Sequence, residues 1–181
     1  MNSLSQFNQN LFLEIFHLSR QNSLVDFFMI FGAEYLVYIA FVLIVFIFWK
    51  NFKKDKNAII LLLLSLLTSL IIIRLVEYIF YEPRPFLTYS INPLIYQPTD
   101  GSFPSLHTAT ITVLAISFFS IKRKYRQLMI VPIFWTGFAR VYTGVHFPGD
   151  ILGGIIIGIV SVLVVQNFLK FTGIFKRPNN L

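Results

Sequence analysis

The chain has 181 residues, of which 56% are hydrophobic and 13% are charged, and its mean hydropathy is +0.71. Soluble domains carry about 25% charged residues, so the composition excludes a water-soluble globular protein and indicates an integral membrane protein. The absence of cysteine excludes disulfides and thiolate metal sites. The net charge of +7 does not indicate nucleic-acid binding, because the basic residues lie in short clusters between apolar runs.

The first twenty residues are predicted to form an amphipathic helix at the membrane interface. Apolar side chains recur there at helical spacing, at Phe7, Leu11, Phe12, Ile15 and Phe16. The residues between them are too polar for a stable membrane span, which favours a helix lying in the interface plane. We expect His17 to be an interface residue without a catalytic role.

The rest of the chain predicts about five transmembrane helices, at residues 24–49, 57 to 81, 104–121, 128–141 and 151–169. Glu34 interrupts the first, so part of that face should point into the bundle. The segment between Arg126 and Arg140 rises only about 20 Å, less than the ~30 Å hydrocarbon core. Arg140 should therefore lie inside the protein, below the far surface. We expect one all-α membrane-embedded domain over residues 1–181.

The distribution of Lys and Arg predicts the orientation. Residues 50–56 and 122–126 hold four basic residues each, and the tail from residue 170 holds three. These segments should face the cytoplasm. The chemically capable side chains should then approach the opposite, outer face: Arg74, Arg84, Arg140, His107, His146 and Asp150.

The segment 139–150 places Arg140, His146 and Asp150 between two apolar runs. Asp150 can accept a hydrogen bond from one ring nitrogen of His146, which fixes the tautomer and leaves the other nitrogen as a nucleophile or base. The planar guanidinium of Arg140 suits a phosphate. The alternative is a cluster at a helix end that only holds a loop in place.

Two other segments should meet this one. In Glu82–Phe86, a proline on each side of Arg84 restricts the backbone and should hold its guanidinium at a helix end. In Phe103–His107, Pro104 suits a first helical turn, where free backbone N–H groups bind anions, and Ser105 adds a hydroxyl donor.

Together these segments predict phosphoryl transfer to water through a phosphohistidine. They supply two arginines, a serine and a helix N-terminus for an anion, together with two histidines. His146 has a carboxylate four residues on, and His107 has none nearby in sequence. This asymmetry suits one histidine that attacks and another that protonates the leaving group.

The order and spacing of the three segments, over residues 77–150, resemble the motifs of the type 2 phosphatidic acid phosphatase superfamily: Lys-x6-Arg-Pro, Pro-Ser-Gly-His and Ser-Arg-x5-His-x3-Asp. The resemblance implies that His146 is the nucleophile, Asp150 orients it and His107 is the general acid. It also implies a phosphate site that needs no metal or cofactor, made by Arg84, Arg140, Ser105 and the backbone N–H of Leu106.

Three positions depart from these motifs: Glu77 replaces the lysine, Leu106 the glycine and Ala139 the serine. Leu106 still has its backbone N–H, whereas Ala139 lacks a hydroxyl. Glu77 reverses a charge and would repel phosphate if it pointed into the site. Arg74 lies one helical turn earlier on the same face. It either pairs with Glu77 or partly replaces the lysine, or the two form a purely structural ion pair.

The short length and the Glu82–Phe86 run are most similar to the bacterial undecaprenyl-diphosphatase branch linked to bacitracin resistance. This similarity implies a multi-pass enzyme of the bacterial cell membrane with an extracellular-facing site. It would convert undecaprenyl diphosphate to the monophosphate, recycling the carrier lipid for peptidoglycan synthesis. Its partners would be this lipid and membrane lipids, with no nucleic acid; no oligomeric state follows.

Three alternatives remain open from the sequence. In the first, the substrate is another lipid phosphate, such as phosphatidylglycerophosphate, phosphatidic acid or a different isoprenoid diphosphate. In the second, the protein binds or transports phospholipid without catalysis, and Glu77 is a sign of lost activity. The third is a metal site built from His107, His146 and Asp150, which predicts inhibition by a chelator.

Overall fold

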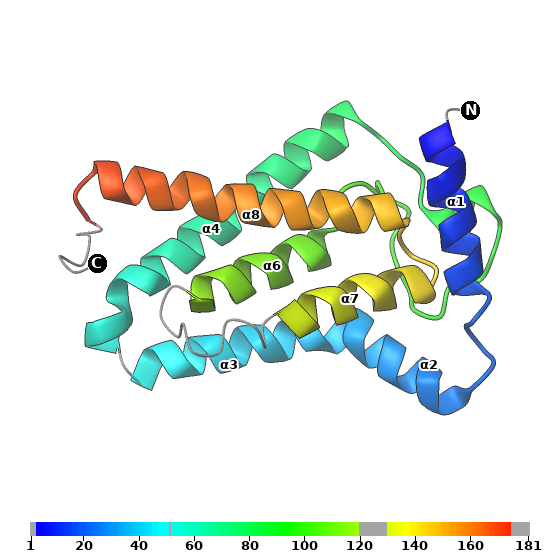
Figure 1. Cartoon of the computed structure of the whole chain (residues 1–181), viewed down its shortest axis with the longest axis horizontal. Coiled ribbons are helices and arrows are strands. Elements are labelled where there is room, and N and C mark those ends of the chain that lie inside the picture. The colour runs from blue at the N-terminus through cyan, green and yellow to red at the C-terminus, as the bar shows by residue number, and fades with distance from the viewer. Residues whose placement is uncertain (1–2, 51, 120–129, 175–181) are drawn as a thin grey trace.

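The computed structural model describes residues 3–50, 52–119 and 130–174, and the described chain is an all-α bundle (Figure 1). Within these ranges, three helical segments are long and apolar enough to cross a membrane: Ser23–Lys50, Lys56–Ile79 and Pro148–Phe171. Two shorter helices, α6 (Leu106–Phe119) and α7 (Ile130–Tyr142), correspond to the predicted spans 104–121 and 128–141. The ends of those two predictions, and the basic cluster between them, lie outside the described residues.

The first span is continuous but changes its winding. It consists of α2 (Ser23–Ile30), the π-helical segment η1 (Phe31–Tyr35) and α3 (Leu36–Lys50). The side chain of Asn22 caps it by accepting hydrogen bonds from the backbone N–H groups of Leu24 and Val25. Gly32 allows close approach to α7, since a Cβ atom there would lie 2.5 Å from the indole nitrogen of Trp135. Glu34 is half-buried, so part of this face points inward as expected.

The second span, α4 (Phe52–Ile79), ends two residues before the predicted limit of 81. Pro83 limits the helix on this side, because a proline disfavours helical backbone at the preceding residue and has no N–H to donate. The segment between the second and third predicted spans contains a short helix, α5 (Pro85–Thr88), with Pro85 at its first position. Arg84 is the N-cap residue of α5 and has extended backbone angles.

Helix α6 lies among the longer helices and packs against α3, α4, α7 and α8 (Pro148–Phe171) (Figure 1). Gly154 and Gly158 of α8 allow the closest approach. A Cβ atom at Gly154 would lie 2.5 Å from the carbonyl oxygen of Ser105, and one at Gly158 would lie 2.7 Å from Cβ of Thr112. Small residues at such spacing bring membrane helices into dense van der Waals contact.

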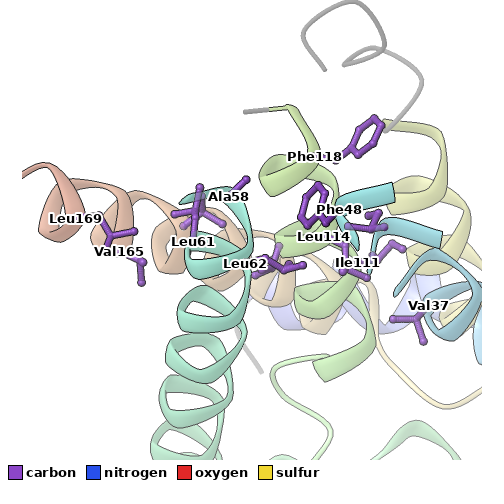
Figure 2. Packing of buried hydrophobic residues seen from close by; sticks show 13 residues of the cluster. Val37, Phe48, Ala58, Leu61, Leu62, Ile111, Leu114, Phe118, Val165 and Leu169 are labelled. Atoms are coloured by element: carbon purple, nitrogen blue, oxygen red, sulfur yellow. The ribbon is translucent and has the colours of Figure 1, made fainter. Parts of the chain in front are cut away.

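The largest buried apolar cluster joins α3, α4, α6 and α8 (Figure 2). It includes Phe48, Leu62, Leu114 and Val165, each at most 5% exposed. These residues come from the end of α3, the start of α4 and the later parts of α6 and α8. The cluster therefore fills the half of the bundle remote from the predicted site. It packs together the helices that carry the site residues.

Helix α1 (Ser3–Phe16) confirms the predicted N-terminal helix, and it docks on the bundle across the end where α7 finishes and α8 begins (Figure 1). Phe12 is fully buried, and its ring lies 5.8 Å from that of Tyr89 and 5.2 Å from that of Phe147. The amide oxygen of Asn8 accepts a hydrogen bond of 2.8 Å from the backbone N–H of Gly149. Helix α1 therefore supports the loop that precedes α8.

Candidate active site

His146 lies in the turn between α7 and α8, and its two ring nitrogens meet opposite charges. Its Nδ1 is 3.3 Å from Oδ2 of Asp150. Its Nε2 is 3.2 Å from Nη1 of Arg84 and 3.2 Å from Nη2 of Arg140. Only 2% of the residue is exposed. This geometry fits a neutral imidazole that donates from Nδ1 and presents an Nε2 lone pair between two guanidinium groups.

The surroundings of His146 keep it neutral. Burial, and then the positive charges of Arg140 and Arg84, hold the pKa of its imidazole well below the usual 6.5. Because the folded-state pKa is lowered, the uncharged form persists at neutral pH and some way below it. An uncharged imidazole is the form that can attack phosphorus.

Asp150 is fixed by the start of α8. It is the third residue of the helix, and its Oδ2 accepts a hydrogen bond of 2.7 Å from the backbone N–H of Phe147. The same oxygen accepts a hydrogen bond from the hydroxyl of Ser102, which is fully buried. The helix N-terminus also favours a negative charge at this position. The carboxylate therefore has a defined orientation towards His146.

The two arginines come from different elements. Arg140 lies in the last turn of α7, is 1% exposed and donates from Nη1 to the carbonyl oxygen of Ala33 in η1, at 3.3 Å. Arg84 is 5% exposed and donates from Nη1 to the carbonyl oxygen of Val145, at 3.1 Å. The expectation that Arg140 lies inside the protein is confirmed. Both guanidinium groups are held by backbone carbonyls and point at the same imidazole nitrogen.

The start of α6 differs from the prediction. Pro104 was expected in the first helical turn, but the helix begins at Leu106 and Pro104 precedes its N-cap. Ser105 is the better cap, because its hydroxyl oxygen accepts hydrogen bonds from the backbone N–H and hydroxyl of Thr108, at 3.5 and 3.1 Å. Its own N–H donates to the Asp150 carbonyl, at 3.1 Å. The backbone N–H groups of Leu106 and His107 donate to no acceptor in the described chain.

His107 is on the first turn of α6, and its ring meets that of Tyr38 edge-on, with centroids 6.3 Å apart. It lies within electrostatic range of Arg84, Arg140 and His146. The predicted histidine pair therefore shares one site. Among the residues that the structure describes, no group of three His, Asp or Glu side chains is placed to hold a metal ion, so their placement does not favour the metal alternative.

Comparison with known proteins identifies the family. A model of the PAP2 superfamily, the type 2 phosphatidic acid phosphatases, matches residues 58–173. The chain belongs to this superfamily. It is 30% identical to undecaprenyl-diphosphatase BcrC of Bacillus subtilis (strain 168) over 170 residues, covering 93% of this chain and 86% of that protein.

Two solved structures resemble this PAP2 chain. LpxE of Aquifex aeolicus has a TM-score of 0.75 at 28% identity, covering 89% of this chain and 95% of its own. A PAP2-type phosphatidylglycerolphosphate phosphatase of Bacillus subtilis has a TM-score of 0.71 at 23% identity, covering 99% and 90%, and supports the fold. The predicted superfamily, the membrane-embedded helical fold and a hydrolase are thereby confirmed.

The charge reversal in the first PAP2 motif is compensated locally. Arg74 and Glu77 of α4 form an ion pair of 2.8 Å, with 59% and 17% of their side chains exposed. The predicted pairing is confirmed, whereas a role of Arg74 in phosphate binding stays a prediction. Glu77 packs near Gly101, since a Cβ atom added at Gly101 would lie 3.7 Å from Cγ of Glu77.

Asp100 and Ser102 are not among the predicted site residues. Oδ1 of Asp100 lies 2.8 Å from Nη2 and 3.0 Å from Nε of Arg84. Both residues belong to an Asp-Gly-Ser sequence, a pattern that usually indicates a solvated loop. Their position could have indicated a role in the site, because these residues immediately precede the Phe103–His107 motif.

Proposed function

We propose that this PAP2 phosphatase hydrolyses undecaprenyl diphosphate to undecaprenyl phosphate and inorganic phosphate, at the outer face of the bacterial cell membrane. The main support is the position of His146, with Nδ1 at a carboxylate and Nε2 at 3.2 Å from each of two guanidinium groups. The similarity to BcrC of Bacillus subtilis over 93% of the chain favours this lipid. Carrier-lipid recycling and tolerance to bacitracin follow from the reaction.

In the first step, Nε2 of His146 attacks the terminal phosphorus, and the bond from that phosphorus to the bridging oxygen breaks. Asp150 holds the Nδ1 proton and stabilises the imidazolium that develops. Arg84 and Arg140 bind the non-bridging oxygens, whose charge they match in the transition state. His107 donates a proton to the bridging oxygen as undecaprenyl phosphate leaves.

In the second step, a water molecule attacks the phosphohistidine. His107, deprotonated by the first step, accepts a proton from this water. The bond between Nε2 and phosphorus breaks, so His146 returns to the neutral form and inorganic phosphate leaves. The hydroxyl of Ser105 and the free N–H groups at the start of α6 bind phosphate oxygens in both steps.

The test is phosphate release from undecaprenyl diphosphate by the detergent-purified protein with EDTA present. We expect release by the parent protein, and a loss of about 10³-fold or more for His146→Ala. His17→Ala is the matched control, because His17 follows the end of α1, is exposed and has no predicted role in the reaction. It should keep full activity.

Other outcomes separate the alternatives. Faster release from phosphatidylglycerophosphate or phosphatidic acid would keep the chemistry and change the lipid. Loss of release with EDTA, restored by a divalent cation, would indicate a metal-dependent reaction. No release from any of these lipids, with retained lipid binding, would indicate a protein that keeps the fold without the reaction.

A further inference from the structure

The loop residues Asp100, Gly101 and Ser102 contact both halves of the charged site. Asp100 binds Arg84, and Ser102 binds Asp150. We propose that this tripeptide is a positioning clamp that orients the phosphate-binding guanidinium of Arg84 and the carboxylate of Asp150 together. The proposal rests on the proposed function, because it assumes that Arg84 binds phosphate and that Asp150 orients His146.

Asp100 binds one edge of Arg84 and leaves another edge for the substrate. Its Oδ1 accepts from Nε and Nη2, at 3.0 and 2.8 Å. The opposite nitrogen, Nη1, faces Nε2 of His146 at 3.2 Å. A guanidinium has five N–H donors in a rigid plane, so fixing one edge with a carboxylate fixes the direction of the other. Asp100 therefore orients the donors that meet the phosphoryl group without occupying their position.

The exposure of the two partners agrees with this role. The Arg84 side chain is 7% exposed, whereas that of Asp100 is 44% exposed. A buried guanidinium needs acceptors for its donors, and Asp100 supplies one from the solvent side. Because the Asp100 carboxylate keeps much of its hydration, the pair retains positive potential on the side of Arg84 that faces His146.

Ser102 acts on the other half of the site. Its buried hydroxyl donates to Oδ2 of Asp150, the oxygen that also faces Nδ1 of His146. With the N–H of Phe147, this gives Oδ2 two fixed donors besides the imidazole. Such donors hold a carboxylate at one angle, and so hold the tautomer and direction of the histidine.

The tripeptide is itself anchored. The backbone N–H of Ser102 donates to the carbonyl oxygen of Glu82, at 2.7 Å. Gly101 lies against α4, near Glu77 and Tyr81. Burial, and then the charge of Asp150, raise the pKa of the Glu82 carboxyl above its usual value. The clamp thus connects the loop after α4 to the start of α8.

The first test measures phosphate affinity without turnover. Binding of inorganic phosphate to the purified protein is followed by calorimetry for the parent, Asp100→Ala, Asp100→Asn and Thr99→Ala. We expect Asp100→Ala to weaken phosphate binding about tenfold, since a misdirected charged donor loses a strong hydrogen bond. Asp100→Asn keeps an acceptor oxygen and should recover most of the lost phosphate affinity. Thr99, exposed in the same loop and without a side-chain hydrogen bond to the described chain, should have no effect.

The second test measures turnover. We expect Ser102→Ala to lower kcat about tenfold with KM little changed, and Ser102→Thr, which keeps the hydroxyl, to restore it. If the alanine variant does not fold, Ser102→Cys replaces it, because a thiol keeps the shape but donates weakly.

Tighter phosphate binding by Asp100→Ala would show that Asp100 competes with the substrate, and would overturn its positioning role. Unchanged phosphate affinity would overturn it as well. An unchanged kcat for Ser102→Ala would overturn the role of Ser102. If the parent protein binds phosphate but does not hydrolyse undecaprenyl diphosphate, the substrate proposal fails while the calorimetry still decides the role of Asp100.

Discussion

Two buried polar atoms of the site, Nε of Arg140 and Oδ1 of Asp150, have no hydrogen-bond partner within the described chain. An unpaired buried polar group lowers stability by about 1–3 kcal/mol, so most folds avoid it. Here the two atoms belong to the residues on either side of His146. The folded protein thus keeps a donor and an acceptor unpaired beside His146, although this lowers its stability.

The ion pair between Arg74 and Glu77 is predicted to act through charge neutralisation. Such an exposed pair is worth only about 0.2–1 kcal/mol of stability, so its loss should change folding little. Arg74→Ala would, however, leave the Glu77 carboxylate unneutralised beside Gly101, and we expect KM for an anionic lipid to rise several-fold. In the double variant Arg74→Ala/Glu77→Gln, both charges are absent and KM should return close to the parent value.

Steady-state kinetics of the parent, the single and the double variant decide between the two roles of Arg74. If Arg74 instead replaces the motif lysine as a phosphate ligand, the double variant stays as impaired as the single one. Full activity of Arg74→Ala would leave the pair with a structural role alone. Thermal unfolding in detergent should show all three proteins within a few degrees of one another.

At the scale of helices, the site depends on the close packing of α6 and α8. Gly154 contacts the carbonyl of Ser105, the N-cap of α6. Gly154→Ala adds a methyl group where the nearest neighbour is rigid backbone, so the helices must separate. We expect a loss of about 1–3 kcal/mol in the free energy of unfolding, together with reduced activity.

Ile156→Ala is the control for this prediction, because Ile156 lies on the same helix and is 60% exposed. Exchanging a lipid-facing apolar residue for a smaller one should change stability by less than about 0.5 kcal/mol. Denaturation in detergent measures the free energy of unfolding of both variants. Equal stability of the two would show that α6 and α8 tolerate a wider separation than their contact indicates.

The spans and the charged motifs were predictable because each rests on a local signal. Hydropathy indicates the apolar helices, and ionisable residues next to them indicate a site. The hydrogen bonds from Asp100 to Arg84 and from Ser102 to Asp150 were not predictable, since they join residues 16 and 48 positions apart. The start of α6 was misjudged for a different reason: proline and serine both suit a helix start, and the serine hydroxyl determined it.

For the molecule as a whole, the two ends of the bundle differ in chemistry. The end with the turn before α8 carries the histidines and the buried arginines. The opposite half holds the large apolar cluster, and α3 ends there at Lys50 and α8 near Lys170. Basic residues at the cytoplasmic side are the usual arrangement in membrane proteins, so the site should face outwards.

Cysteine labelling in intact bacterial cells tests this orientation, and the parent chain has no cysteine to interfere. Tyr96→Cys marks the loop before the clamp, where Tyr96 is 86% exposed, and Lys56→Cys marks the exposed start of α4. A membrane-impermeant maleimide should label Tyr96→Cys in intact cells and Lys56→Cys only after permeabilisation. The reverse pattern would place the site in the cytoplasm, where it could not act on a lipid diphosphate exposed at the outer leaflet.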